Sequence, residues 1–300
     1  MRLIGRARDI VTSPTGGAPI LCAEDSFDAE LRPDRTIVAI EADPPRPNLT
    51  QLVGTRGGGR LRHALEHFVP EERRNATPLY LILDDISGAS LVAPWAWSQW
   101  KKNWLESAGA SMTRPQLNRM IQDMEGICTG FAPGSSSLDP ERLVGQSEDG
   151  TPAPDLRHPE DPEGWHAFTL QNTIGMRRAR RIDVRLEHVI FIEAAFQDSA
   201  AKPDGTRAAL HEYQLSATAD PSSLRLLSID ATPRVLPFGE CPGAVRNISR
   251  LLDSELPQLR QTVLDQLPGT LGCTHLNDAL RALAEVPTLV NYLRGARRAA

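Results

Sequence analysis

Two parts of the chain can be aligned at a shift of 189 residues, and this internal similarity constrains the fold more than any other feature. At this shift the order of predicted strands and helices agrees over the whole matched length, and a one-residue slip continues the register into the helices. The matched pairs include Asp9 with Asp198, Leu21 with Leu210, Ile40 with Ile229, Ala42 with Ala231, Arg60 with Arg250 and Leu81 with Leu271. We therefore predict two degenerate copies of one structural unit. The alternative is a chance similarity between two halves of the same class.

Short apolar runs between turn residues predict the strands, and longer runs with helical spacing predict the helices. Strands are expected near 2–11, 20–31 and 36–42, and again near 181–186, 189–197, 208–219 and 224–231. Helices are expected near 60–68, 95–106, 115–127 and 243–255, from Pro257, and after Cys273. The helix at 60–68 should bury Leu61, Leu65 and Phe68. The predicted fold class is α+β, with each half a small antiparallel sheet packed with helices.

The expected domain organisation follows from the repeat and from one change in composition. Residues 1–92 form the first copy, without a complete metal site, and residues 166–300 form the second copy with the candidate site. Residues 93–165 are an insertion of helices and a loop rich in Pro, Gly and Ser. Trp97, Trp100 and Trp104 would share one helical stripe in this insertion, as core packing or as the wall of a pocket.

Charge and hydropathy exclude several classes of protein. The formal net charge of −5 argues against a nucleic-acid-binding protein, which is usually basic. The chain has no apolar run of the roughly 20 residues that span a membrane, and its first residues lack a secretory signal. A cytoplasmic location is the default expectation. The four cysteines are then expected to be free, metal-bound or catalytic.

The stretch from Glu240 to Asp278 concentrates the potential chemistry of the chain. Cys241 begins it, Cys273 and His275 lie near its end, and His211 precedes it on a predicted strand. Thiolate and imidazole groups are the ligands that zinc prefers, and they also bind iron. We expect these four residues to hold a Zn or Fe ion. Candidate general bases or ligand-orienting residues are Glu212, Glu240 and Asp278.

Two alternatives remain open for these residues. Cys273 at a helix start, two residues from His275, would suit a cofactor-free cysteine nucleophile. The cysteines would otherwise be small buried core residues. The run His63–His67 matches an inverted zinc-protease motif, but its histidines are expected to face solvent. The arginine run 177–181 could bind an anionic ligand, but a solvated charge run on an edge strand is the favoured interpretation.

Several quoted motifs resemble a bacterial family of unknown function, the domain-of-unknown-function family 2889. They are Phe196-Gln197-Asp198-Ser199, His211-Glu212-Tyr213, Pro233-Arg234-Val235-Leu236-Pro237, Glu240-Cys241-Pro242 and Cys273-Thr274-His275-Leu276-Asn277-Asp278. The resemblance covers about Trp165 to Leu293. It implies no activity.

A more distant resemblance links the second half to the U-type iron–sulfur cluster scaffolds. In that family one ligand starts a strand, one follows the next strand, and one begins the last helix. The resemblance implies that His211, Cys241 and Cys273 occupy these three positions. This sequence departs from that pattern at three positions: His211 replaces a cysteine, Tyr213 stands where an acidic residue is expected, and His275 is additional. Such a set favours a single zinc or iron ion over a transferable cluster.

The first hypothesis for function is a metal-dependent enzyme that performs hydrolytic or lyase chemistry on a small organic molecule. A non-catalytic metal carrier or assembly factor is the alternative, and the cofactor-free enzyme is the third. The expected partner is a small-molecule substrate, with a homodimer left open. No nucleic-acid or membrane partner is expected.

Overall fold

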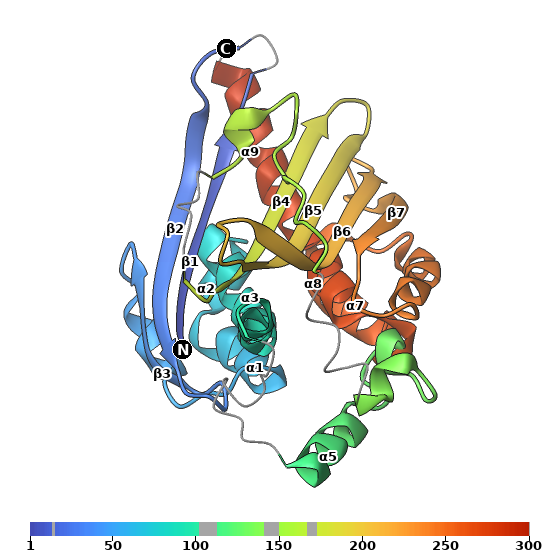
Figure 1. Ribbon diagram of the computed structural model, residues 1–300. Helices are drawn as coiled ribbons and strands as arrows, with labels where there is room; N and C mark the ends of the chain where they lie inside the picture. Colours follow the sequence, from blue (N-terminus) through green and yellow to red (C-terminus); the bar gives the residue numbers. More distant parts are fainter. Residues whose placement is uncertain (14–15, 102–112, 141–149, 167–172, 300) are drawn as a thin grey trace. The chain divides into compact units, whose positions relative to one another are not determined.

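The computed structural model describes residues 1–13, 16–101, 113–140, 150–166 and 173–299 (Figure 1). These residues form two compact units. The first unit comprises Met1–Leu91, Arg157–His166 and Glu285–Ala300, and the second comprises Val92–Leu156 and Ala167–Ala284. Within the described part of the chain, no helix has the length and apolar character needed to cross a membrane.

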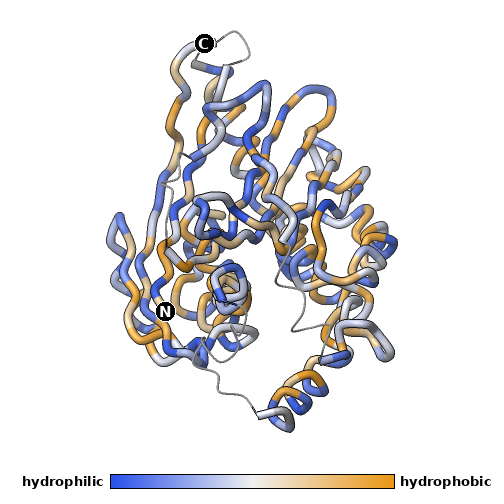
Figure 2. The backbone as a smooth tube through the Cα atoms, viewed as in Figure 1, coloured by the Kyte–Doolittle hydropathy of each residue, from blue (hydrophilic) through white to orange (hydrophobic). Residues whose placement is uncertain are grey.

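The sheet of the first unit is an antiparallel meander of three strands. Its strands, in the order β1-β2-β3, are β1 (Arg2–Val11), β2 (Ile20–Leu31) and β3 (Ile37–Asp43). Every second residue of the later part of β2 is buried, as expected for a strand with one face on a core. Figure 2 shows the corresponding alternation of hydrophobic and hydrophilic residues along the strands. The strands predicted at 2–11, 20–31 and 36–42 are confirmed.

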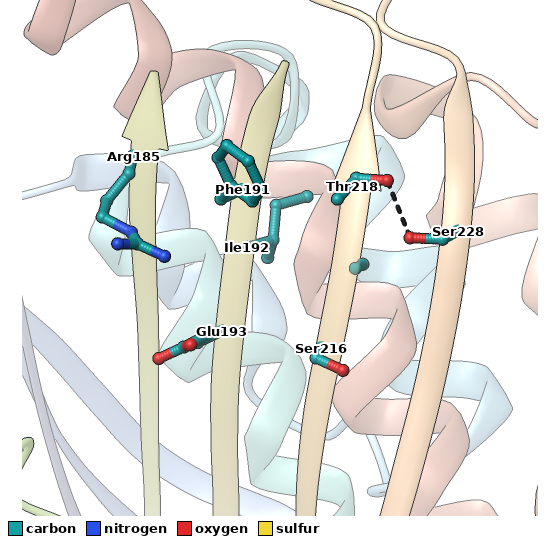
Figure 3. Close-up of a pocket in the computed structure, with 8 residues that line it drawn as sticks. Arg185, Phe191, Ile192, Glu193, Ser216, Thr218 and Ser228 are labelled. Carbon is teal, nitrogen blue, oxygen red and sulfur yellow. Dashed lines mark hydrogen bonds between the residues drawn. The ribbon is translucent and has the colours of Figure 1, made fainter. Parts of the chain in front are cut away.

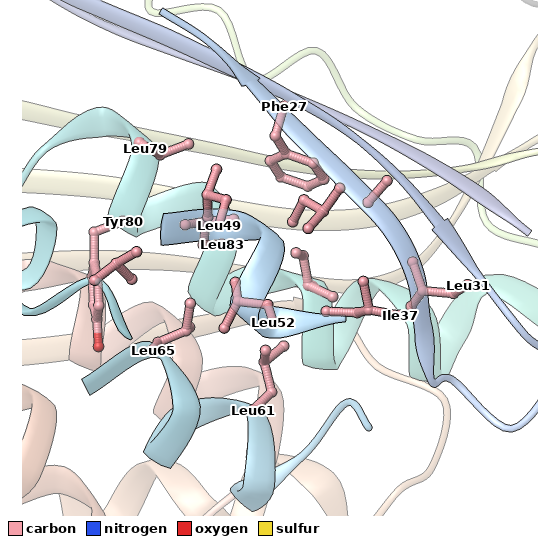
Figure 4. Packing of buried hydrophobic residues seen from close by; sticks show 14 residues of the cluster. Phe27, Leu31, Ile37, Leu49, Leu52, Leu61, Leu65, Leu79, Tyr80 and Leu83 are labelled. Carbon is pink, nitrogen blue, oxygen red and sulfur yellow. The ribbon is translucent and has the colours of Figure 1, made fainter. Parts of the chain in front are cut away.

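Three helices complete the hydrophobic core of the first unit (Figure 4): η1 (Pro47–Leu52), α1 (Gly59–Phe68) and α3 (Pro78–Val92), where η denotes a 3₁₀ helix. The helices α2 (Pro70–Arg74), η5 (Pro162–Gly164) and α9 (Val286–Ala299) also begin in this part of the structure. Leu61 and Leu65 of α1 are fully buried and Phe68 packs at the edge of the cluster, which confirms the predicted face. His63 and His67 are exposed, which confirms that these two histidines face solvent.

The sheet of the second unit has four antiparallel strands in the order β4-β5-β6-β7. They are β4 (Met176–Leu186), β5 (Ile190–Ala201), β6 (Arg207–Ala219) and β7 (Leu226–Val235). The second half of β5 is buried at every residue, which indicates that both of its faces are covered. The α+β class and the antiparallel sheets predicted from the sequence are confirmed.

The other elements of this part of the chain are short helices, and Figure 1 shows α7 and α8 on one side of the sheet. They are η2 (Ala93–Gln99), α5 (Arg114–Met124), η3 (Thr129–Phe131), η4 (Ser136–Leu138), η6 (Cys241–Leu251), η7 (Leu256–Gln258), α7 (Leu259–Gln266), η8 (Gly269–Leu271), α8 (Thr274–Ala282) and η9 (Leu283–Glu285). Trp97 lies in η2 and Trp100 follows it. Trp100 donates its indole N–H to the carbonyl oxygen of Ala201 at 2.7 Å. Trp104 lies outside the described residues.

The two sheets share their irregularities. A β-bulge follows Asp9 where β1 pairs with β2, and another follows Asp198 where β5 pairs with β6. Positive φ angles occur at Arg35, before β3, and at Leu224, before β7. These positions coincide at the shift of 189 residues found in the sequence. Each bulge therefore lies at the same place in its own meander.

The compact units are not consecutive in sequence, in contrast to the expected ranges 1–92, 93–165 and 166–300. Most of the expected insertion belongs to the second unit, whereas residues 157–166 belong to the first. The last helix, α9, also belongs to the first unit, where it packs against β1. Such long-range returns of the chain leave no local pattern in a sequence.

Candidate metal centre

Strands β5 and β6 bring an aspartate and a histidine together. Asp198 is the cross-strand partner of His211, and directly paired residues of an antiparallel sheet point to the same face. The Asp198 Oδ2 atom lies 3.2 Å from His211 Nδ1. Asp198 is completely buried, and His211 nearly so. The pair therefore lies beneath the helices that cover this face of the sheet.

Helix α8 supplies a second imidazole at its second residue, His275. Its Nε2 atom lies 3.8 Å from Asp198 Oδ2, and its Nδ1 atom lies 3.4 Å from the hydroxyl of Thr274. The His211 and His275 rings are stacked, with centroids 3.4 Å apart. One ligand atom each from Asp198, His211 and His275 lies within 4.8 Å of the other two. We call these three residues the imidazole–carboxylate group.

Arg178 of β4 fixes the aspartate of this group. Its Nε and Nη2 atoms donate to the two oxygens of Asp198 at 2.8 and 3.0 Å. Its Nη1 atom donates to Asp278 Oδ2 at 3.0 Å, so that one guanidinium joins both carboxylates. The guanidinium also lies over the buried ring of Phe196, 4.9 Å from its centroid. A planar fork of this kind holds the Asp198 carboxylate in one orientation.

Burial and neighbouring charges set the protonation of the group. Burial alone would raise the pKa of Asp198, but the Arg178 guanidinium and the His211 hydrogen bond hold it well below its usual range. Burial lowers the pKa of His211, and burial together with the adjacent His211 ring lowers that of His275 further. At neutral pH the group therefore contains one carboxylate and two neutral imidazoles. Neutral imidazoles have lone pairs available for a metal ion.

The cysteines lie in a separate cluster of the same unit. Cys128, Cys241 and Cys273 are buried at the starts of η3, η6 and α8. The hydroxyl of Tyr213, which is completely buried, faces the Cys273 sulfur. Burial raises the pKa of each thiol, to about 12 for Cys241, so that all three are protonated at neutral pH. We call these three cysteines and Tyr213 the thiol cluster.

The four predicted metal ligands thus occur in two groups. His211 and His275 belong to the imidazole–carboxylate group, and Cys241 and Cys273 belong to the thiol cluster. Of the predicted catalytic residues, Asp278 contacts the first group through Arg178. Glu240 accepts hydrogen bonds from the backbone N–H and the hydroxyl of Ser136, both at 2.8 Å, next to the thiol cluster.

Glu212 lies on the other face of the sheet, because neighbouring residues of a strand point to opposite faces. It is buried there, and its Oε2 atom accepts a hydrogen bond from Gln197 at 2.8 Å. That face also carries a shallow cavity of about 130 Å³ (Figure 3). Arg185, Phe191 and Glu193 line it on the side of β4 and β5. Neither the cavity nor Glu212 shares the sheet face of the imidazole–carboxylate group.

Sequence reasoning missed three residues of these groups. Asp198 occurs in the internal repeat and in a quoted motif but carried no predicted role. Arg178 belongs to the arginine run interpreted as solvated; this interpretation is wrong for Arg178, whose side chain is 4% exposed. Cys128 lies in the expected insertion, far in sequence from the other cysteines. Its own residue type was the only available signal.

Comparison with known proteins supports a relationship for part of the chain. Residues 176–289 match the model of the DUF2889 family, which is described as a protein of unknown function. The resemblance stated from the motifs is confirmed over these residues, which include β4 to β7, η6, α7 and α8. No curated protein and no solved structure matches the chain.

Proposed function

We propose that the imidazole–carboxylate group holds a zinc or iron ion. In a tetrahedral site with bonds of roughly 2.0–2.1 Å, neighbouring ligand atoms are about 3.3 Å apart. The observed separations from Asp198 Oδ2, 3.2 Å to His211 and 3.8 Å to His275, are close to this value. Two imidazoles and one carboxylate are also a common catalytic ligand set, since three protein ligands leave a position open. This convergence is the observation that carries the proposal.

The charges around the group favour zinc or iron over magnesium or calcium. Arg178 and Arg281 offset the negative charges of Asp198 and Asp278, so the surroundings carry little net negative charge. Hard divalent cations depend on carboxylate-rich sites, whereas imidazole is a good ligand for zinc and iron. An ion bound by both histidines has to lie close to both ring planes. The stacked rings must therefore rotate apart when it binds.

A hydrolytic or lyase reaction on a small organic molecule is the chemistry that we infer. An ion with an open position would polarise a bound water or carbonyl group. Arg178 would keep Asp198 oriented, and Asp278 would hold Arg178 in place. His275 is the most exposed member of the group, with 13% of its side chain accessible, and a substrate would approach past this ring. Burial keeps the Cys273 thiol protonated, which disfavours the cofactor-free alternative.

The same reasoning favours an enzyme over a metal carrier. The U-type resemblance would use His211, Cys241 and Cys273 together, but these residues belong to two groups.

We also infer that the two units derive from duplication of one meander. This is supported by the bulges after Asp9 and Asp198 and by the positive φ angles of Arg35 and Leu224.

The test is the metal content of protein purified without an affinity tag. We expect zinc or iron in the wild type, and about one equivalent less in His211→Ala and in Asp198→Asn. His63→Ala is the control because His63 is exposed on α1, and it should retain the wild-type content. Equal metal content in all four proteins would refute the site. A chelator-sensitive hydrolase or lyase activity that is lost in His211→Ala would then identify the reaction.

A further inference from the structure

The thiol cluster assembles where three segments of the second unit meet. Thr129, next to Cys128, donates its backbone N–H to the carbonyl oxygen of Gly272, next to Cys273, at 2.8 Å. Asn247 of η6 donates to the carbonyl oxygen of Leu271 at 2.7 Å. These bonds join the cysteine-bearing starts of η3, η6 and α8 through neighbouring residues.

Gly130 shows how closely two of the sulfurs approach one backbone position. A Cβ atom at Gly130 would lie 2.6 Å from Cys241 Sγ and 3.8 Å from Cys128 Sγ. Only glycine leaves room for the Cys241 sulfur at this point. The sulfurs of Cys128 and Cys241 therefore lie on the same side of the Gly130 backbone.

Backbone N–H groups are directed at two of the sulfurs. Burial raises the pKa of the Cys128 thiol, and the nearby backbone N–H groups of Gly130 and Thr274 lower it. Burial likewise raises the pKa of Cys273, and the backbone N–H groups of His275 and Leu276 lower it. Two of the three sulfurs thus share the N-terminus of α8, whose dipole stabilises negative charge. Such donors stabilise a thiolate that has lost its proton to a metal ion.

The buried hydroxyl of Tyr213 is directed at the Cys273 sulfur. Its hydrogen bond to this sulfur lowers the pKa of the Cys273 thiol, against the larger effect of burial, which raises it. An O–H donor of this kind would stabilise a Cys273 thiolate bound to a metal ion.

We propose that Cys128, Cys241 and Cys273 form a three-thiolate site for a thiophilic metal ion such as Zn²⁺, Cd²⁺ or Cu⁺. The three sulfurs are not all within 4.8 Å of one another. Bonds of roughly 2.3 Å in a tetrahedral site would bring them to about 3.8 Å. Rotation of the cysteine side chains between staggered rotamers moves the sulfurs without moving the backbone. Each thiol releases its proton to solvent when it binds the ion.

This site is separate from the imidazole–carboxylate group and does not depend on the function proposed for it. The probe is Cd²⁺, added to reduced protein in the absence of air. Thiolate–cadmium bonds produce an ultraviolet charge-transfer absorption that imidazole and carboxylate ligands do not. We expect this absorption to saturate at one equivalent in the wild type and to be unchanged in His63→Ala, at an exposed position of α1. Cys128→Ser should lower its amplitude by about a third and weaken cadmium binding at least tenfold.

Cys22→Ser is the matched control, because Cys22 is the one cysteine outside the cluster, in the first unit. It should leave the absorption unchanged. The proposal is wrong if folded wild-type protein gives no thiolate absorption, or if Cys128→Ser gives the full amplitude. If the serine variants do not fold, cadmium NMR of the wild type decides the question. A chemical shift typical of three sulfur ligands supports the site, and one typical of only nitrogen and oxygen ligands refutes it.

Discussion

His211 and His275 stack face to face, with ring centroids 3.4 Å apart and planes inclined by 17°. One ring comes from β6, one of the two central strands, and the other from the first turn of α8. The stack therefore joins a helix to the sheet beneath it. His275 therefore has two possible roles with different requirements. Packing against His211 requires a flat ring, whereas metal binding requires a ring nitrogen.

His275→Phe tests these roles separately. Phenylalanine preserves the flat ring and similar volume, so we expect the free energy of unfolding in urea to change by less than about 1.5 kcal/mol. The variant should nevertheless lose about one equivalent of metal, because it has no ligand atom. His67→Phe, at an exposed position of α1, should change neither quantity. Full metal content in the folded His275→Phe protein would remove His275 from the site.

Arg178→Ala should be among the most destabilising substitutions in the second unit. It leaves the completely buried Asp198 carboxylate without its guanidinium partner, which typically costs about 3–5 kcal/mol. The measurement is urea unfolding. Arg2→Ala removes an ion pair between exposed side chains, Arg2 and Asp28, and should cost far less stability than Arg178→Ala. Similar losses in both variants would show that the Arg178 network contributes no more than a surface pair.

Gly130→Ala should disturb the thiol cluster. The added methyl group would meet the Cys241 sulfur at 2.6 Å, and crowding of this kind costs about 1–3 kcal/mol. We also expect weaker cadmium binding, since Cys241 has to move. Gly239→Ala is the control, because a Cβ atom there meets nothing within 4 Å. Equal unfolding free energies and cadmium affinities for the two variants would contradict the close packing at Gly130.

Asp9 should make the stability of the first unit depend on pH. Burial, with the nearby carboxylates of Glu285 and Asp25, raises the pKa of Asp9 to about 7. A raised pKa in the folded state means that the unfolded chain ionises first. The stability contribution of protonated Asp9 is therefore complete below about pH 4 and is lost as the pH rises towards 7.

Asp9→Asn removes this dependence. We expect it to raise the free energy of unfolding by about 2–4 kcal/mol at pH 8 and to have little effect at pH 4. Asp28→Asn is the control. Hydrogen bonding to Arg2 lowers the pKa of Asp28, so this variant should change the pH dependence of stability in the opposite direction from Asp9→Asn. A stability difference between Asp9→Asn and wild type that stays constant from pH 4 to pH 8 would refute the assignment.

The sequence predicts the strands better than the helices. Strand patterns are local, and β2 shows this plainly because alternate residues from Asp25 to Leu31 are buried. Leu79 to Leu83 carried no predicted helix, yet they lie in α3, which is apolar on most sides. The predicted α-helix at 243–255 is a 3₁₀ helix over Cys241–Leu251. Its apolar spacing does not distinguish two helix types of similar period.

The sequence indicates which residues carry the chemistry but not how they are grouped. Cys241 and Cys273 have the residue types of metal ligands, but the side of the sheet that each sulfur faces depends on long-range packing. The burial of Arg178 likewise depends on Asp278 of α8, which is distant in sequence. Cys128 joins the thiol cluster through hydrogen bonds between Thr129 and the segment before Cys273. None of these relationships has a periodicity that a single sequence can show.

The most direct test of the central claim is NMR of the histidine ring nitrogens during addition of up to two equivalents of Zn²⁺. The chain has seven histidines, and we predict that only the ring-nitrogen signals of His211 and His275 move to positions typical of metal coordination. The same titration of Asp198→Asn should shift neither signal at these zinc concentrations. If the wild-type signals of His211 and His275 stay unchanged while zinc binds elsewhere, the imidazole–carboxylate group is a structural network and the proposed metal centre is wrong.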